Sequence, residues 1–136
     1  MSATKDQKVL KAYDFVYAKA AQKYAEISGT TDTLAEGDVG IKQVCTNAGA
    51  VVITLPSAAA GNEYKVECGN ANQTSLSVSP AAADKIGGNG QTVAAATDNK
   101  DLQNMSPALG DYAVVKYHST VGWIVSECRG NWTFEA

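Results

Sequence analysis

Several residue types that mark common functional classes are scarce in this chain of 136 residues. It holds one histidine and eleven lysines and arginines against fourteen acidic residues, which gives a net charge of −3. Nucleic-acid-binding domains cluster their basic side chains to meet phosphates, whereas here these side chains are scattered, apart from some density near the N-terminus. No apolar run approaches 18 residues, so a transmembrane helix is not expected. We therefore expect neither a nucleic-acid nor a membrane partner.

Cysteine and histidine are also too sparse to define a chemical site. The chain has three cysteines, Cys45, Cys68 and Cys128. Their number is odd, and no two of them form a Cys-x-x-Cys pair. The polar N-terminus lacks the apolar core of a signal peptide, so we expect synthesis in a cytoplasm and no disulfide framework. The cysteines are expected to be small buried side chains in strands. A metal site is disfavoured because His118 is the sole imidazole, and we expect no cofactor.

The beginning of the chain has the pattern of one long amphipathic helix over residues 4–27. Thr4 is a suitable N-cap with Gln7 at the capping-box position, and Gly29 suits the residue after a helix end. A helix of about 24 residues is roughly 36 Å long, which is long for a domain of this size. Apolar residues recur at spacings of three, four or seven, in one row of Val9, Tyr13, Val16, Ala20 and Ile27 and a second of Leu10, Tyr17 and Tyr24.

We therefore expect residues 1–29 to form a helical arm and residues 30–136 to form a β domain. The apolar helix face has two alternative roles: it packs on the core of its own domain, or it contacts another subunit. In the second role, the interface residues are Val9, Tyr13, Val16, Tyr17 and Tyr24.

From residue 30 onward the sequence predicts β structure, organised around residues 51–61. Residues 51–55 are rich in β-branched side chains, and Pro56 has no N–H for a ladder, so a strand should end there. Residues 75–79 alternate serine with leucine and valine, a period of two. The other expected strands are 33–35, 41–46, 63–68, 91–95, 112–118, 123–127 and 130–134.

Two polar segments are expected to be loops. Residues 84–90 contain three closely spaced glycines and predict a flexible turn; a phosphate-binding loop is rejected because a strand, not a helix, is expected to follow. Residues 98–109 predict an irregular surface loop, the kind of segment that often carries contacts. The expected fold is mainly β, an antiparallel sandwich, jelly roll or β-tulip-like arrangement, with one long N-terminal α-helix.

The order of motifs in the β region resembles a known group of proteins. The motifs are Ile53-Thr-Leu-Pro-Ser-Ala, Tyr64-Lys-Val, Leu76-Ser-Val-Ser-Pro, Asp84-Lys-Ile-Gly-Gly, Tyr112-Ala-Val-Val-Lys-Tyr, Gly122-Trp-Ile-Val and Gly130-Asn-Trp-Thr. This order is similar to small β modules of tailed-bacteriophage virion proteins, over roughly residues 39–133. As a short chain with one such module, it looks most like a capsid decoration (cement) protein.

The resemblance implies a homotrimer without catalytic residues that sits on the capsid surface and reinforces the shell of major capsid protein. Its helix or its loops would contact the shell, and it would be made in the host cytoplasm. The alternative is a tail-fibre or head-fibre module that binds a host-surface glycan. A cement protein should carry an apolar patch at the helix, whereas a glycan-binding tip should expose aromatic side chains at its distal loops.

The residues whose side chains could take part in catalysis do not form a catalytic pattern. His118 is predicted at a hairpin turn without a carboxylate nearby in sequence, and Ser57, Ser106 and Ser119 lack a Gly-x-Ser-x-Gly context. We therefore do not expect an enzyme. The acidic residues Asp38, Asp84, Asp98 and Asp101 lack the dense spacing of a calcium loop. Trp123 and Trp132 have two possible roles, filling the core or stacking on a sugar, of which the first is preferred.

Overall fold

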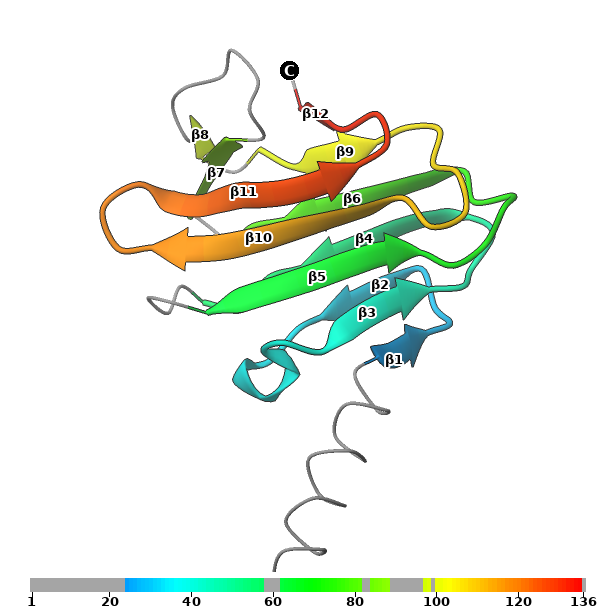
Figure 1. Ribbon diagram of the computed structural model, residues 1–136, viewed down its shortest axis with the longest axis horizontal. Coiled ribbons are helices and arrows are strands. Elements are labelled where there is room, and N and C mark those ends of the chain that lie inside the picture. The colour runs from blue at the N-terminus through cyan, green and yellow to red at the C-terminus, as the bar shows by residue number, and fades with distance from the viewer. Residues whose placement is uncertain (1–23, 58–61, 82–83, 89–96, 99, 136) are drawn as a thin grey trace, which may run out of the picture.

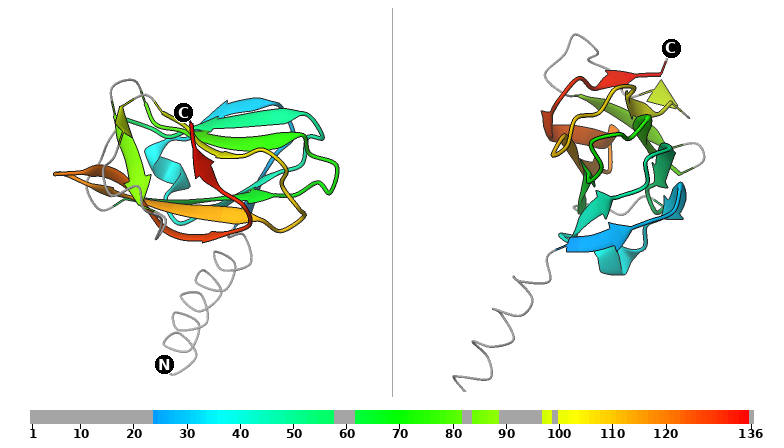
Figure 2. Two further views of the ribbon diagram at one scale, coloured as in Figure 1. Left: turned by 90° about the horizontal axis from the view of Figure 1, so that it is seen from above. Right: turned by 90° about the vertical axis from the view of Figure 1, so that its right-hand side faces the viewer.

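The computed structural model describes residues 24–57, 62–81, 84–88, 97–98 and 100–135, without the side chains of 97 and 98. These residues form two sheets that face each other (Figures 1 and 2). The seven-stranded sheet has the order β1 (Tyr24–Ile27), β3 (Lys42–Cys45), β5 (Glu63–Cys68), β10 (Tyr112–His118), β11 (Gly122–Arg129), β7 (Lys85–Gly88) and β8 (Thr97–Asp98). The five-stranded sheet has the order β12 (Thr133–Phe134), β9 (Leu102–Asn104), β6 (Ser75–Ser79), β4 (Ala50–Thr54) and β2 (Thr31–Thr33).

The first six strands wind as stacked coils. The chain alternates between the two sheets, so that β1, β3 and β5 lie parallel in one sheet while β2, β4 and β6 lie parallel in the other. Each parallel neighbour is thus reached through a strand of the opposite sheet, which provides the long connection that parallel pairing needs. The later strands pair mainly antiparallel, with β10 on β5 and β9 on β6.

Alternation of side chains along the strands places one apolar core between the sheets. Val66 and Val115 from one sheet and Leu76 and Val78 from the other are fully buried there. Trp123 packs edge-on between Tyr64 and Tyr117, with ring centroids 5.6 and 5.3 Å away. These residues belong to a single cluster that spans both sheets, and no second core is present among the described residues.

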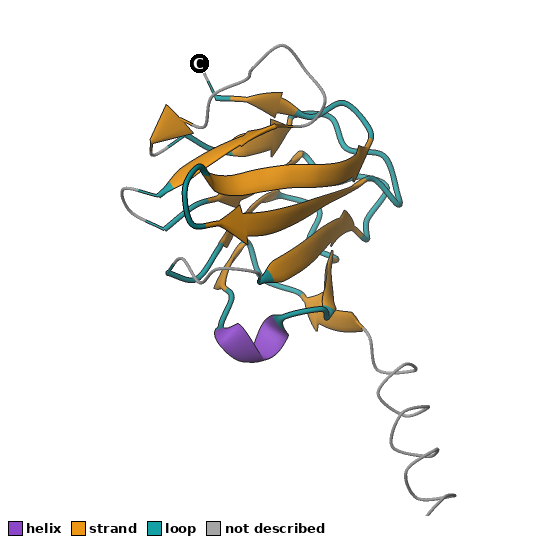
Figure 3. Ribbon diagram, turned by 60° about the vertical axis from the view of Figure 1, so that its left-hand side comes forward, coloured by secondary structure: helices purple, strands orange, loops and turns teal. Residues whose placement is uncertain are grey.

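The predicted fold class needs two corrections. The described residues contain no α-helix, only a 3-10 turn at Glu36–Asp38 (Figure 3). The predicted helix over 4–27 is wrong at its end, where Tyr24–Ile27 is strand β1, and its residues 4–23 lie outside the described part. The apolar pattern of these four residues fits a strand period of two as well as a helical period. They form a strand because they pair with β3, which places Ile27 in the core.

The second correction concerns strand direction. The prediction was an antiparallel arrangement, whereas both sheets are mixed and half of the ten strand pairs among the described residues are parallel. An alternating apolar pattern fixes which face of a strand is buried but is the same for both directions. The direction therefore depends on the connections, which the pattern does not reveal.

Several predicted strands match closely, while two loop predictions are wrong. The expected ranges 63–68, 75–79 and 112–118 coincide with β5, β6 and β10. Lys85–Gly88, expected as a turn, is strand β7 parallel to β11. A Cβ at Gly122 would lie 2.7 Å from the Lys85 carbonyl oxygen, so glycine allows the two backbones to approach. Leu102–Asn104, expected in a loop, is β9; the expected strand 91–95 lies outside the described residues.

Candidate interaction surface

Only one of the five predicted interface residues lies in the described part of the chain. Tyr24 is 60% exposed at the start of β1. It belongs to the edge of the seven-stranded sheet rather than to a helix face. Val9, Tyr13, Val16 and Tyr17 lie outside the described residues.

The residues considered for catalysis or metal binding are dispersed. His118 is exposed at the end of β10, opposite Gly122 across the hairpin, and Ser57, Ser106 and Ser119 are exposed on separate turns. Asp38 accepts a hydrogen bond from the Ala35 N–H at 2.8 Å, which is a turn contact. Among the residues that the structure describes, no group of three or more His, Cys, Asp or Glu side chains could hold a metal ion.

Both tryptophans are buried, in agreement with the preferred role in the core. Trp123 has no exposed surface and Trp132 is 3% exposed. The Trp132 indole N–H donates to the Arg129 carbonyl at 2.8 Å, which closes the turn before β12. Neither ring is available for stacking on a sugar in this structure.

All three cysteines lie in strands as expected, but only two of the three are buried. Cys45 and Cys68 are free thiols, buried and directly opposite each other on β3 and β5, while Cys128 is half-buried on β11. Burial, with smaller contributions from Cys68 and Asp32, raises the pKa of Cys45 to about 12. A thiol with that pKa is neutral near pH 7, so Cys45 is not a nucleophile.

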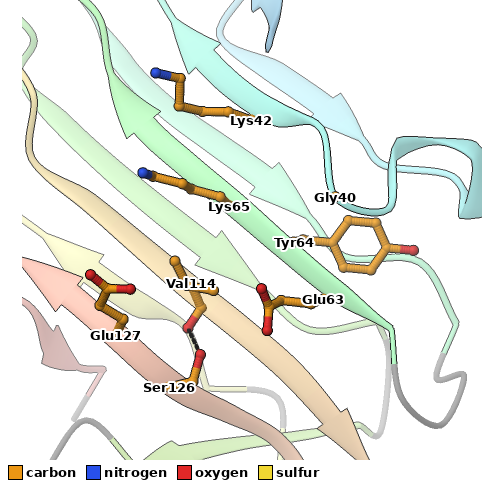
Figure 4. A pocket seen from close by; sticks show the side chains of 8 residues that line it. All are labelled: Gly40, Lys42, Glu63, Tyr64, Lys65, Val114, Ser126 and Glu127. Atoms are coloured by element: carbon orange, nitrogen blue, oxygen red, sulfur yellow. Dashed lines mark hydrogen bonds between the residues drawn. The ribbon is translucent and has the colours of Figure 1, made fainter. Parts of the chain in front are cut away.

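The outer face of the seven-stranded sheet carries a charged groove of about 470 Å³. Lys42, Lys65 and Glu127 line it from neighbouring strands (Figure 4). Lys42 pairs with Glu67 at 3.3 Å, and the Lys65 ammonium lies 4.1 Å from the centre of the Tyr112 ring. The Tyr112 hydroxyl donates to Glu127 at 2.6 Å, a bond that raises the pKa of the tyrosine. Lys42, Lys65 and Glu127 therefore each have a partner on the sheet, and only the contact of Lys42 is an ion pair, as is common on a solvated surface.

Large exposed hydrophobic side chains are few in the described part of the chain, and two of them share one loop. The full set is Tyr24, Val39, Met105, Leu109 and Val121. Residues 105–110, here called the 105–110 loop, connect β9 to β10 and read Met-Ser-Pro-Ala-Leu-Gly. Met105 is 62% and Leu109 64% exposed, while Pro107 between them is buried.

This loop is held in place from beneath by buried polar side chains. The Asp111 carboxylate accepts hydrogen bonds from the Asn104 amide and from the Ala108 N–H, both at 3.0 Å. The Gly110 N–H donates to the Cys68 carbonyl at 2.9 Å, which ties the loop to the end of β5. The sequence predicted a surface loop here but did not single out Met105 and Leu109 as exposed. The feature that could have indicated them is the run without charged residues between Asp101 and Asp111.

No family model matches the chain, and no curated protein matches it.

Among the described residues, no helix is long and apolar enough to cross a membrane.

Proposed function

We propose that this chain is a structural virion protein of a tailed bacteriophage, a capsid decoration (cement) protein that binds the outside of the assembled head. The observation that carries the proposal is the kind of side chain that the loops expose. A glycan-binding tip is expected to present aromatic rings at its distal loops. The exposed large hydrophobics of the described loops are aliphatic, and both tryptophans are buried.

The way in which the coils are fastened gives further support. The Asn47 side chain donates to the Ser28 carbonyl at 3.0 Å, and the Asn70 side chain donates to the Thr46 carbonyl at 2.9 Å. Each turn is thereby bonded to the turn of the preceding coil. A body ordered before binding loses little conformational entropy when it docks, which suits a protein whose role is reinforcement.

The proposed mechanism is stabilisation by mass action. A protein that binds the assembled shell and not the loose major capsid subunits shifts the equilibrium toward the shell. As a homotrimer it would present three copies of each contact, so that individually weak contacts become strong together. The mechanism needs no enzymatic step and no cofactor.

The direct test uses heads of the phage that encodes the chain, prepared without this protein. Adding the full chain should give saturable cosedimentation and raise the temperature at which the heads release their DNA. An unrelated β protein of similar mass serves as the control. If the chain neither sediments with the heads nor shifts the release temperature, but binds host-cell glycans, the cement proposal is wrong and the fibre alternative is supported.

A further inference from the structure

We propose that the 105–110 loop is the contact that docks this protein on the shell, with Met105 and Leu109 entering an apolar pocket on the assembled capsid. This inference rests on the proposed function and names the part of the molecule that would bind. Three observations support it: the loop exposes two large hydrophobic side chains, it has no charged residue, and buried hydrogen bonds hold its backbone in place.

Exposure singles out this loop first. Met105 and Leu109 are the two most exposed large hydrophobic side chains among the described residues, and they lie four positions apart on one short connection. Water is displaced favourably when such side chains are buried in a partner. Aliphatic residues that are exposed singly are ordinary, so it is the occurrence of two on one short loop that we take as the sign of a contact.

Charge then defines the partner. Residues 105–110 contain no ionisable side chain, whereas the outer face of the seven-stranded sheet carries lysine and glutamate. An uncharged apolar loop gains nothing from a charged surface such as nucleic acid. The complementary site is an apolar one, and under the proposed function it lies on the capsid protein.

The support beneath the loop makes it suitable for docking. Asn104 is fully buried and Asp111 is 8% exposed, and their hydrogen bond fixes both ends of the loop. The Ser106 N–H donates to the Asn104 side chain at 3.2 Å. Since the backbone is already ordered, binding does not have to fix it.

The size of the contact indicates a repeated partner. Two side chains cover far less than the roughly 800 Å² per partner that a stable pair of proteins buries. One loop would therefore bind weakly, and a useful affinity requires several loops on one body that meet several equivalent pockets. An assembled shell offers such a repeated array, whereas a second copy of this chain or a single loose capsid subunit does not.

The test compares head binding by the full-length chain and by the double variant Met105→Ser, Leu109→Ser. The expected result is a loss of affinity of roughly a hundredfold per loop, with the oligomeric mass and melting temperature unchanged. Val121→Ser is the matched control, because Val121 is an exposed aliphatic at the β10–β11 hairpin tip, at the opposite end of the sheets (Figure 1). The single variants Met105→Gln and Leu109→Gln replace the double variant should it fail to fold.

The outcomes separate this inference from the proposed function. If the wild-type chain binds heads and the double variant binds equally well, the loop is not the contact and the inference is wrong, while the proposed function stands. If the double variant instead loses its oligomeric state, the loop is a self-contact and the inference is also wrong. If the wild-type chain fails to bind heads, or binds only phosphatidylcholine vesicles, the inference and the proposed function fall together.

Discussion

Strands β1–β6 and strands β9–β12 contribute to one core but are joined by different contacts. In the first group, parallel coils are tied turn to turn by the side chains of Asn47 and Asn70. In the second group, a long antiparallel hairpin is anchored by Trp123 between two tyrosines. Both groups share the buried core, and Tyr64 of the aromatic cluster belongs to β5. What differs is the additional contact, which is hydrogen bonding between turns in the first group and the packing of aromatic rings on Trp123 in the second.

The largest effect is expected from Trp123→Ala in the hairpin group. The ring is fully buried, so its removal leaves a cavity and should lower the free energy of unfolding by about 3–5 kcal/mol. Chemical denaturation followed by circular dichroism measures this. Ile124→Ala, on the half-buried opposite face of the same strand, is the control and should cost less. Equal losses would mean that the aromatic cluster does not anchor the hairpin.

A pH titration tests the burial of Cys45 in the coiled group. Its pKa is about 12 when folded against a reference of 9.0, so above pH 9 the unfolded chain loses a proton that the folded chain keeps. The free energy of unfolding should therefore fall as the pH rises from 9 toward 12, by up to about 1.4 kcal/mol per pH unit. Cys45→Ala should show a shallower fall in denaturation experiments at pH 8, 9 and 10. Identical slopes would contradict the burial of this thiol.

Asn70→Ala tests the bonding between turns. The variant loses the bond to the Thr46 carbonyl and the 2.8 Å bond accepted from the Asn72 N–H, which should cost about 1–2 kcal/mol. Asn72→Ala, an exposed residue on the same turn, should cost under about 0.5 kcal/mol. If the two variants are equally stable in urea, the turns do not hold the coils together.

Asp32→Val is expected to have the smallest effect on the free energy of unfolding. It should nevertheless make the protein associate into larger assemblies. Among the described residues, strands β1 and β2 are the edge strands of the two sheets at the same end of the molecule (Figure 1). The register puts Asp32 in the row of the buried Ile53 and Val78, on the inward side of the last strand, where the side chain is exposed. A charge directed inward at an edge prevents a further strand from adding.

Replacing Asp32 with valine extends the apolar row to the open edge, so light scattering should detect larger assemblies as the concentration rises. Thr31→Val is the matched control, since Thr31 lies on the outward side of the same strand in the row of Val52. Assemblies that are equally large for both variants would show that the inward charge does not protect this edge.

Part of the β domain could be predicted because some of its strands alternate in sequence and end at clear signals. Leu76 and Val78 are fully buried, as the period of two over residues 75–79 indicates, and β4 ends at Thr54, before Pro56 as expected. The cysteines and tryptophans were predicted to be inside for the same reason, that they lie within or beside apolar strands.

The rest could not be predicted because it depends on contacts between distant segments. Tyr24–Ile27 has too few residues to distinguish a helix from a strand, and only its pairing with β3 decides. The pair Gly87 and Gly88 signals a turn in isolation, yet here glycine serves the close approach of β7 to β11. The exposure of Met105 and Leu109 likewise follows from the buried Asn104 and Asp111 beneath them.

The central claim is that a trimeric body brings several weak loops to the shell at once. Light scattering coupled to size exclusion, on the full chain at micromolar concentration, tests it most directly. The account predicts the mass of three 14.2-kDa chains, unchanged in Met105→Ser, Leu109→Ser. The mass of one chain, persisting in the presence of heads, would contradict it.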